Sequence, residues 1–503
     1  MSLLDSNYMN KAAEQMIPDV LRYNPPKNAD VIQGTEKVRV LPMSQTNYGS
    51  AKGNAGVTPA RVCRFRLSET DRFIDPRSIK LEANIKTYAV VGPDPDNDTP
   101  NFTPPDAFCN GLIESVKLYC NGSECEYLNS YNTLYYLLLA STQPKEYYNH
   151  QGQWEGCWLH RDQPALGNTS YAYINTNDFN KAGGGAPANT AELLTVLNAQ
   201  IKTHPSIKSY NNSTWATNAL KNGDKFQWQL ILGLFQQEKF LVPGLTWDLE
   251  ITFSDFDQAF RVTNPGAGRA YQYENMVLKY NAMQLHPSYV SAMRTQMSNG
   301  GIPLSFSSYS LVQNVVGTNK DFNLLISRGV SRLQSIWTVF QPSSPGAAEV
   351  NKPGYFLAPG GSDINRLRYM INGHQFPSGY EIRSMVDAFN EFQESMSQYE
   401  VRDAGGLVSW SLYNNKTYQA QQTIDGVANE DVFAVPSPLF ILGMNFMKTN
   451  ESVSSSLNTS ELGGQMMIEA QMSADWSQAC TAKSFLHFEK ALNITDQGVI
   501  LLE

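Results

Sequence analysis

Alternation of apolar and polar side chains dominates the chain from about residue 57 onward. This period of two is typical of a half-buried strand. The clearest segments in the first half of the chain are 62–67, 79–85, 112–119, 226–232 and 246–253. Turn-rich stretches separate them, at 92–105 with its five prolines and at 149–224, which is rich in Asn, Gly and Thr. Short strands joined by long loops favour a β-sandwich or a jelly roll.

The N-terminal segment has a different pattern. Its apolar side chains recur at helical spacing and stop at Pro18, which predicts a short amphipathic helix. The residues of this stripe are Leu4, Tyr8, Met9, Ala12, Ala13, Met16 and Ile17. Prolines and glycines then predict an irregular stretch from residue 22 to 56. We therefore expect residues 1–56 to form an extended arm. Its helix either packs back on the chain's own core or docks on a neighbour or an apolar surface.

The most informative pattern is an internal match. The segment Leu118–Gly122 (LYCNG) is matched by Tyr369–Gly373 (YMING), 251 residues later (369 minus 118). Each is an apolar strand that ends in Asn-Gly, the sequence preferred in a type I′ hairpin turn. Helical patterns follow at 128–139 and 385–396, and similar strands precede the two matches at 79–85 and 330–339. The repeated order of elements predicts a duplicated fold.

The join between the two copies is also visible in the sequence. Residues 274–285 are predicted to form a strand, and 286–301 a helix and turn before new strands begin. The segment 485–492 is the equivalent closing strand of the second copy. We therefore expect a first domain at 57–285, a connector at 286–300 and a second domain at 301–503.

Composition agrees with a folded, structural chain. Of the 503 residues 42% are hydrophobic and only 17% are charged, so a large core can be buried. The formal net charge is −9 and cations are not clustered, which disfavours binding to nucleic acid or to an anionic membrane surface. We expect no secretion signal and no membrane-spanning segment. The six cysteines are sparse and are predicted to be free thiols.

Three motifs could carry chemistry, and each departs from its pattern. His160-Arg161-Asp162 matches the start of a kinase catalytic loop, but the position of the metal-binding Asn is occupied by Gly167. The kinase Lys and Asp-Phe-Gly motifs are absent as well. A Ca²⁺ loop could begin at 94, with carboxylates at 94, 96 and 98, but it has Thr99 and Pro105 where an EF-hand needs Gly and Glu.

The third motif is a set of zinc-type ligands. Cys120 and Cys125 lie near His150, Cys157 and His160 in the sequence, but paired Cys-x-x-Cys spacings are missing. Buried apolar thiols fit these positions better. We therefore expect no catalytic residue, no metal site and no cofactor, and hence no enzyme.

As a whole, the chain resembles the double jelly-roll major capsid proteins of eukaryotic DNA viruses, in particular the virophage and polinton-like group. The resemblance rests on the two matched strand-turn units with their helical stretches and on the closing strand and connector at 274–301. It implies an all-β fold of two tandem eight-stranded jelly rolls, with short helices in the connections and an extended N-terminal arm. It also implies homotrimers with a pseudo-hexagonal outline that tile an icosahedral shell.

The same resemblance implies partners and a location. The chain would contact other copies of itself, neighbouring capsomers, and minor capsid and penton proteins. The arm would lie on the inner side of the shell, where it bridges neighbours or touches an internal membrane. Sequence-specific nucleic acid is not expected as a direct partner. The protein would be assembled inside the host cell and end in the virion.

An alternative from a different class stays open. A tandem β-sandwich that binds or hydrolyses glycans would use aromatic side chains and paired carboxylates. The tryptophans that could stack on sugars are Trp154, Trp158, Trp228, Trp247 and Trp337. Core packing is the other use of these side chains.

Overall fold

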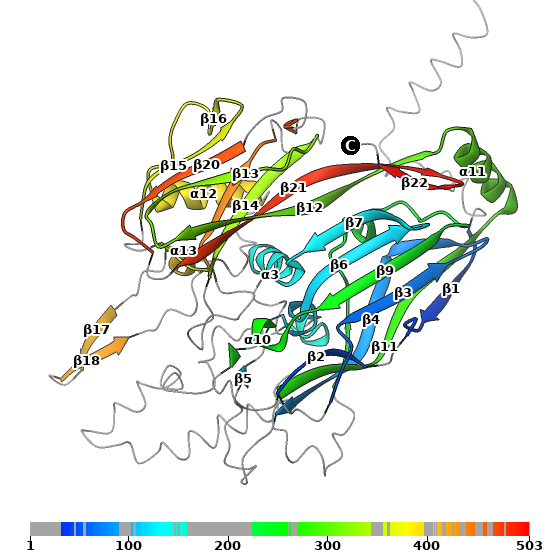
Figure 1. Ribbon diagram of the computed structural model, residues 1–503, viewed down its shortest axis with the longest axis horizontal. Coiled ribbons are helices and arrows are strands. Elements are labelled where there is room, and N and C mark those ends of the chain that lie inside the picture. Colours follow the sequence, from blue (N-terminus) through cyan, green and yellow to red (C-terminus); the bar gives the residue numbers. More distant parts are fainter. Residues whose placement is uncertain are drawn as a thin grey trace, which may run out of the picture.

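A computed structural model provides the structure of the chain (Figure 1). The structure describes residues 32–44, 47–53, 57–89, 102–103, 107–144, 147, 151–157, 224–259, 261–262, 269–343, 356–359, 363–396, 406, 408, 410–414, 419–424, 427–432, 439–447, 456–459, 466–476 and 479–501. The predicted amphipathic helix at residues 4–17 lies outside these ranges.

The first half of the chain forms two packed antiparallel sheets. One has five strands in the order β1-β11-β4-β8, with β2 also paired to β11. Its strands are β1 (Ile32–Val40), β2 (Tyr48–Lys52), β4 (Phe73–Ala89), β8 (Asp224–Trp228) and β11 (Arg269–Leu285). The other sheet has the order β3-β9-β6-β7. Its strands are β3 (Val62–Ser68), β6 (Ile113–Cys120), β7 (Ser123–Asn129) and β9 (Thr246–Phe253).

The second half repeats this arrangement. Its five-stranded sheet has the order β12-β21-β14-β19, with β22 paired to β21, and its four-stranded sheet has the order β13-β20-β15-β16. The strands are β12 (Ile302–Gly317), β13 (Asp321–Ile326), β14 (Leu333–Pro342), β15 (Ile364–Ile371), β16 (His374–Phe376), β19 (Ile441–Asn445), β20 (Met466–Met472), β21 (Cys480–Thr495) and β22 (Gly498–Leu501).

The two halves have the same strand connectivity. In each half the first, third, sixth and last strands of the roll form one sheet, and the second, fourth, fifth and seventh form the other. This is the jelly-roll topology, in which two antiparallel sheets enclose a common core. The duplication predicted from the matched Asn-Gly units is therefore confirmed, and so is the all-β fold class. The predicted domain boundaries remain predictions.

The two Asn-Gly units form the equivalent hairpin in each half. Asn121 and Gly122 join β6 to β7 with φ angles of 46° and 85°, and Asn372 and Gly373 join β15 to β16 with 52° and 80°. Two successive positive φ angles define a type I′ turn, as predicted.

A helix follows this hairpin in both halves. The first is α3 (Tyr131–Thr142) and the second is α12 (Met385–Ser395), which Ser384 caps through its hydroxyl, an acceptor from the amide of Asp387. The connector between the halves is α11 (Pro287–Asn299), close to its predicted range. The short remaining elements are α2 (Phe108–Gly111), α5 (Gln151–Trp154), α9 (Gly233–Gln236), α10 (Phe256–Ala259), α13 (Trp410–Asn414), β5 (Phe102–Thr103), β10 (Arg261–Val262), β17 (Gln419–Ile424) and β18 (Val427–Val432).

One part of the sequence prediction is wrong. Residues 22–56 were expected to be irregular, but β1 and β2 lie within them and both pair with β11. The pattern was misleading because β1 is an edge strand with exposed side chains on both faces. Only Val38 and Val40 alternate and pack half-buried on the core, while Gly34 and Glu36 interrupt the same face, so the apolar pattern is too short to predict a strand.

Candidate functional site

The two halves meet along a seam, and helix α3 lies in it (Figure 1). Ten of the residues of α3 are buried, so the helix is covered on more than one side. On one side it packs against α2 and β6 of the first half. On the other, the ring of Tyr136 lies 5.8 Å from that of Phe356, and the carbonyl of Ala140 accepts from the amide of Val408 at 3.3 Å. The helix has no charged side chain, which suits such a buried position.

A buried carboxylate also spans the seam. Glu126, on β7, is inaccessible to solvent. Its carboxylate accepts from the amides of Gly233 at 2.9 Å and Leu234 at 3.2 Å, and from the hydroxyl of Ser308 at 2.8 Å. One side chain therefore links β7 and α9 of the first half to β12 of the second.

The environment of Glu126 sets its charge. Burial raises the pKa of this carboxyl to about 6, although the three donors and the nearby Lys490 favour the ionised form. The group is therefore mostly ionised at neutral pH, with each of its hydrogen bonds made to a charged acceptor. Such bonds are stronger than those between neutral groups.

The seam is also very tight at α9. A Cβ placed on Gly233 would lie 1.7 Å from the carbonyl oxygen of Ser307, which is far inside van der Waals contact. Only glycine fits where α9 touches β12. A second close approach involves Gly406, whose Cβ would lie 2.4 Å from the carbonyl oxygen of Ala140 in α3.

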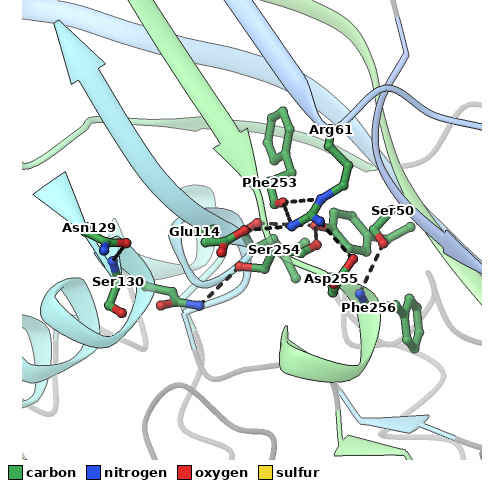
Figure 2. Close-up of polar contacts among 12 residues, drawn as sticks. Ser50, Arg61, Glu114, Asn129, Ser130, Phe253, Ser254, Asp255 and Phe256 are labelled. Carbon is green, nitrogen blue, oxygen red and sulfur yellow. Dashed lines mark hydrogen bonds and ion pairs between the residues drawn. The ribbon is translucent and has the colours of Figure 1, made fainter. Parts of the chain in front are cut away.

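A cluster of polar side chains connects strands β6 and β9 of the first half to helix α3 (Figure 2). The guanidinium of Arg61 donates to the carbonyl of Phe253 at 3.1 and 3.0 Å and to Glu114 at 2.7 Å, and it lies 3.2 Å from Asp255. The side-chain amide of Asn132, in α3, donates to the hydroxyl of Ser254 at 3.2 Å. These contacts join the ends of β6 and β9 to the helix in the seam.

Lys483, on β21, extends this cluster to the second half. Its ammonium lies 3.5 Å from the hydroxyl of Thr133 in α3. Burial lowers the pKa of Lys483 to about 8, while the carboxylate of Glu114 acts in the opposite direction. Both halves therefore contribute polar side chains to the seam.

None of these seam residues was identified from the sequence. The signal for Glu126 was present, since it alternates with Leu128 and therefore shares a strand face with an apolar residue. The partner that makes its burial favourable, Ser308, is 182 residues away. Nothing in the local sequence points to that contact.

The residues that the sequence singled out lie mostly elsewhere. The arm stripe, Asp94–Asp98, His150 and His160–Asp162 lie outside the described residues. All six cysteines are free and buried, as predicted. Burial raises the pKa of the Cys63 and Cys109 thiols well above the ordinary value, which leaves them protonated. Within the described ranges no group of three or more His, Cys, Asp and Glu could hold a metal ion.

The tryptophans considered for glycan stacking divide into two groups. Trp228, Trp247 and Trp337 are buried in the core, whereas Trp154 is exposed. Trp158 lies outside the described residues. Buried indoles cannot stack on a sugar, so core packing accounts for three of the five. Among the helices that the structure describes, none has the length and apolar character needed to cross a membrane.

Comparisons with known proteins identify the fold. The chain superposes on a chain of the Sputnik virophage with a TM-score of 0.54 and 11% identity, over 96% of this chain and 92% of that one. The Faustovirus major capsid protein gives 0.52 and 9%, over 98% and 94%, and a capsid chain of PBCV-1 gives 0.50 and 9%, over 96% and 99%. No protein-family model and no curated protein matches the sequence. The chain has the double jelly-roll fold, which it shares with these viral major capsid proteins.

Proposed function

We propose that this chain is the major capsid protein of a virus and that its role is structural rather than enzymatic. The observation that carries the proposal is the repeated strand order of the two halves in one chain. Two similar jelly rolls in each chain suit a subunit that packs into a regular lattice. The likeness to capsid chains over nearly the whole length supports the same role.

The duplicated fold has a geometric use in a shell. Three chains with two similar jelly rolls each provide six near-equivalent walls, so a trimer acquires a pseudo-hexagonal outline. Such outlines tile a surface, and many weak contacts between capsomers add up in a closed shell. We therefore propose homotrimeric capsomers in an icosahedral virion that is assembled inside the host cell.

The partners follow from the same role. Neighbouring capsomers, minor capsid proteins and penton proteins would contact the outside of each trimer. The N-terminal arm, with its stripe from Leu4 to Ile17, would lie on the inner side and bridge neighbours or touch an internal membrane. The net charge of −9 leaves condensation of the genome to other proteins.

Light scattering combined with negative-stain microscopy tests the proposal. The purified chain, expressed with and without a viral assembly factor, should have three times the chain mass of 56.1 kDa and a hexagonal face. A particle that stays monomeric under both conditions would contradict the capsid role. Glycan-array binding and hydrolysis assays on that monomer would then test the alternative function.

A further inference from the structure

We infer that the exposed edge strand β1 in the first half of one copy is covered by β16 and α12 in the second half of another copy. This inference rests on the proposed capsomer. It specifies which surfaces of the chain meet between subunits. We expect the contact between copies to repeat the contact between the two halves of one chain.

Within the chain, the first half covers the leading strand of the second. Strand β7 and helix α9 contact β12, with Glu126 bonded to Ser308 and Gly233 pressed against Ser307. As a result Leu304 and alternate residues after it on β12 are buried. The duplication makes β1 the equivalent of β12, β16 the equivalent of β7, and α12 the equivalent of α3.

The equivalent surfaces are left open within one chain. Strand β1 has exposed side chains on both faces, and its least exposed side chains, Val38 and Val40, are only half-buried, whereas alternate residues of β12 are buried. Figure 1 shows β1 and β16 on opposite sides of the chain, so one chain cannot bring them together. A second copy that repeats the internal seam would do so, and three such contacts close a ring.

Exposed apolar side chains occur on both surfaces. At β1 and the turn after it, Ile32 is 48% exposed, Leu41 71% and Met43 53%. Beside β16 and on α12, Tyr380 is 48% exposed and Val386 53%. Burying these exposed apolar groups against a partner would be favourable.

The charges of the two surfaces are complementary. Lys37 and Arg39 are exposed on β1. Arg39 also lies 3.6 Å from Glu82, and Glu36 is paired with Arg72. Helix α12 has three carboxylates and neither Lys nor Arg. Its Glu391 is buried and accepts from Tyr380, which leaves Asp387 and Glu394 closer to solvent. Opposite charges on facing surfaces select the partner and its orientation.

Charge reversal with rescue tests the contact. The variants Lys37→Glu/Arg39→Glu and Asp387→Lys/Glu394→Lys should each lose the trimer in sedimentation velocity, and a chain with all four changes should regain it. Lys320→Glu/Arg328→Glu is the matched control, since these exposed cations flank β13 on the opposite edge of the sheet from β16. That control should remain trimeric. Circular dichroism should give the same folded spectrum for every variant.

The outcomes separate this inference from the proposed function. A monomeric wild type would contradict the capsomer itself. A wild-type trimer with trimeric variants, or with variants that the fourfold change does not rescue, would overturn the contact and leave the capsomer standing. A zero-length carbodiimide crosslinker applied to the wild-type trimer adds a test without substitutions: Lys37 should join Asp387 or Glu394 in a crosslinked dimer. Absence of that crosslink counts against the contact.

Discussion

The hydroxyl of Ser308 donates a hydrogen bond of 2.8 Å to the carboxylate of Glu126, across 182 residues of sequence. This contact joins the two jelly rolls at a place where neither residue can reach water. Buried polar groups of this kind are favourable only when all partners are present. The two rolls are therefore expected to unfold together.

The first prediction concerns the substitution Glu126→Ala. It leaves the amides of Gly233 and Leu234 and the hydroxyl of Ser308 without their acceptor. Each unpaired buried group costs about 1–3 kcal/mol, so we expect a loss of about 3 kcal/mol or more in the free energy of unfolding. Urea denaturation measures it. Glu124→Ala, at an exposed position on the same strand, is the control and should change stability by less than about 0.5 kcal/mol.

The second prediction is the pH dependence of that loss. The pKa of Glu126 is raised to about 6 by burial, above its unfolded value, so the folded state binds the proton more tightly. The stabilisation from this shift is present below the unfolded pKa and is lost as the pH rises through 6. The stability difference between wild type and Glu126→Ala should shrink by about 1.5 kcal/mol between pH 4.5 and pH 7. A difference that stays constant over this range would disprove the shift.

The third prediction tests the tight contact between α9 and β12. A methyl group in Gly233→Ala would collide with the backbone carbonyl of Ser307, which cannot rotate away as a side chain would. We expect a loss of about 3 kcal/mol, measured by thermal unfolding. Gly34→Ala, where a Cβ meets no atom within 4 Å, should unfold close to the wild-type temperature. Equal melting temperatures for the two variants would mean that the halves are not pressed together here.

Local patterns were sufficient for the elements whose side chains alternate or follow a helical period. Strand β9 has the predicted bounds, and α12 ends one residue before its predicted limit. The start of α3 was placed three residues early because Leu128 and its neighbours fit a helical spacing although they belong to β7. Strand β1 was missed because its apolar alternation is confined to Val38 and Val40, and backbone bonds to β11 hold the rest of this edge strand.

The seam could not be predicted for a different reason. Its members, Glu126, Gly233 and Lys483, have no shared local pattern, because each acts through a residue of the other half. The duplication shows that two similar rolls exist, but it does not show which faces of them touch. That information comes only from the packing of the folded chain.

The last prediction tests the hairpins that revealed the duplication. Gly122 and Gly373 occupy equivalent turns with φ angles of 85° and 80°, and a Cβ at either position would meet no atom within 4 Å. The cost of an alanine there is therefore conformational alone, about 1–2 kcal/mol for a left-handed backbone. Gly122→Ala and Gly373→Ala should lower the free energy of unfolding by similar amounts in urea. If the chain unfolds in a single transition, the loss should appear in that transition for both variants. If either variant instead shows a separate early transition, the two rolls unfold independently and the seam contributes less than its buried contacts indicate.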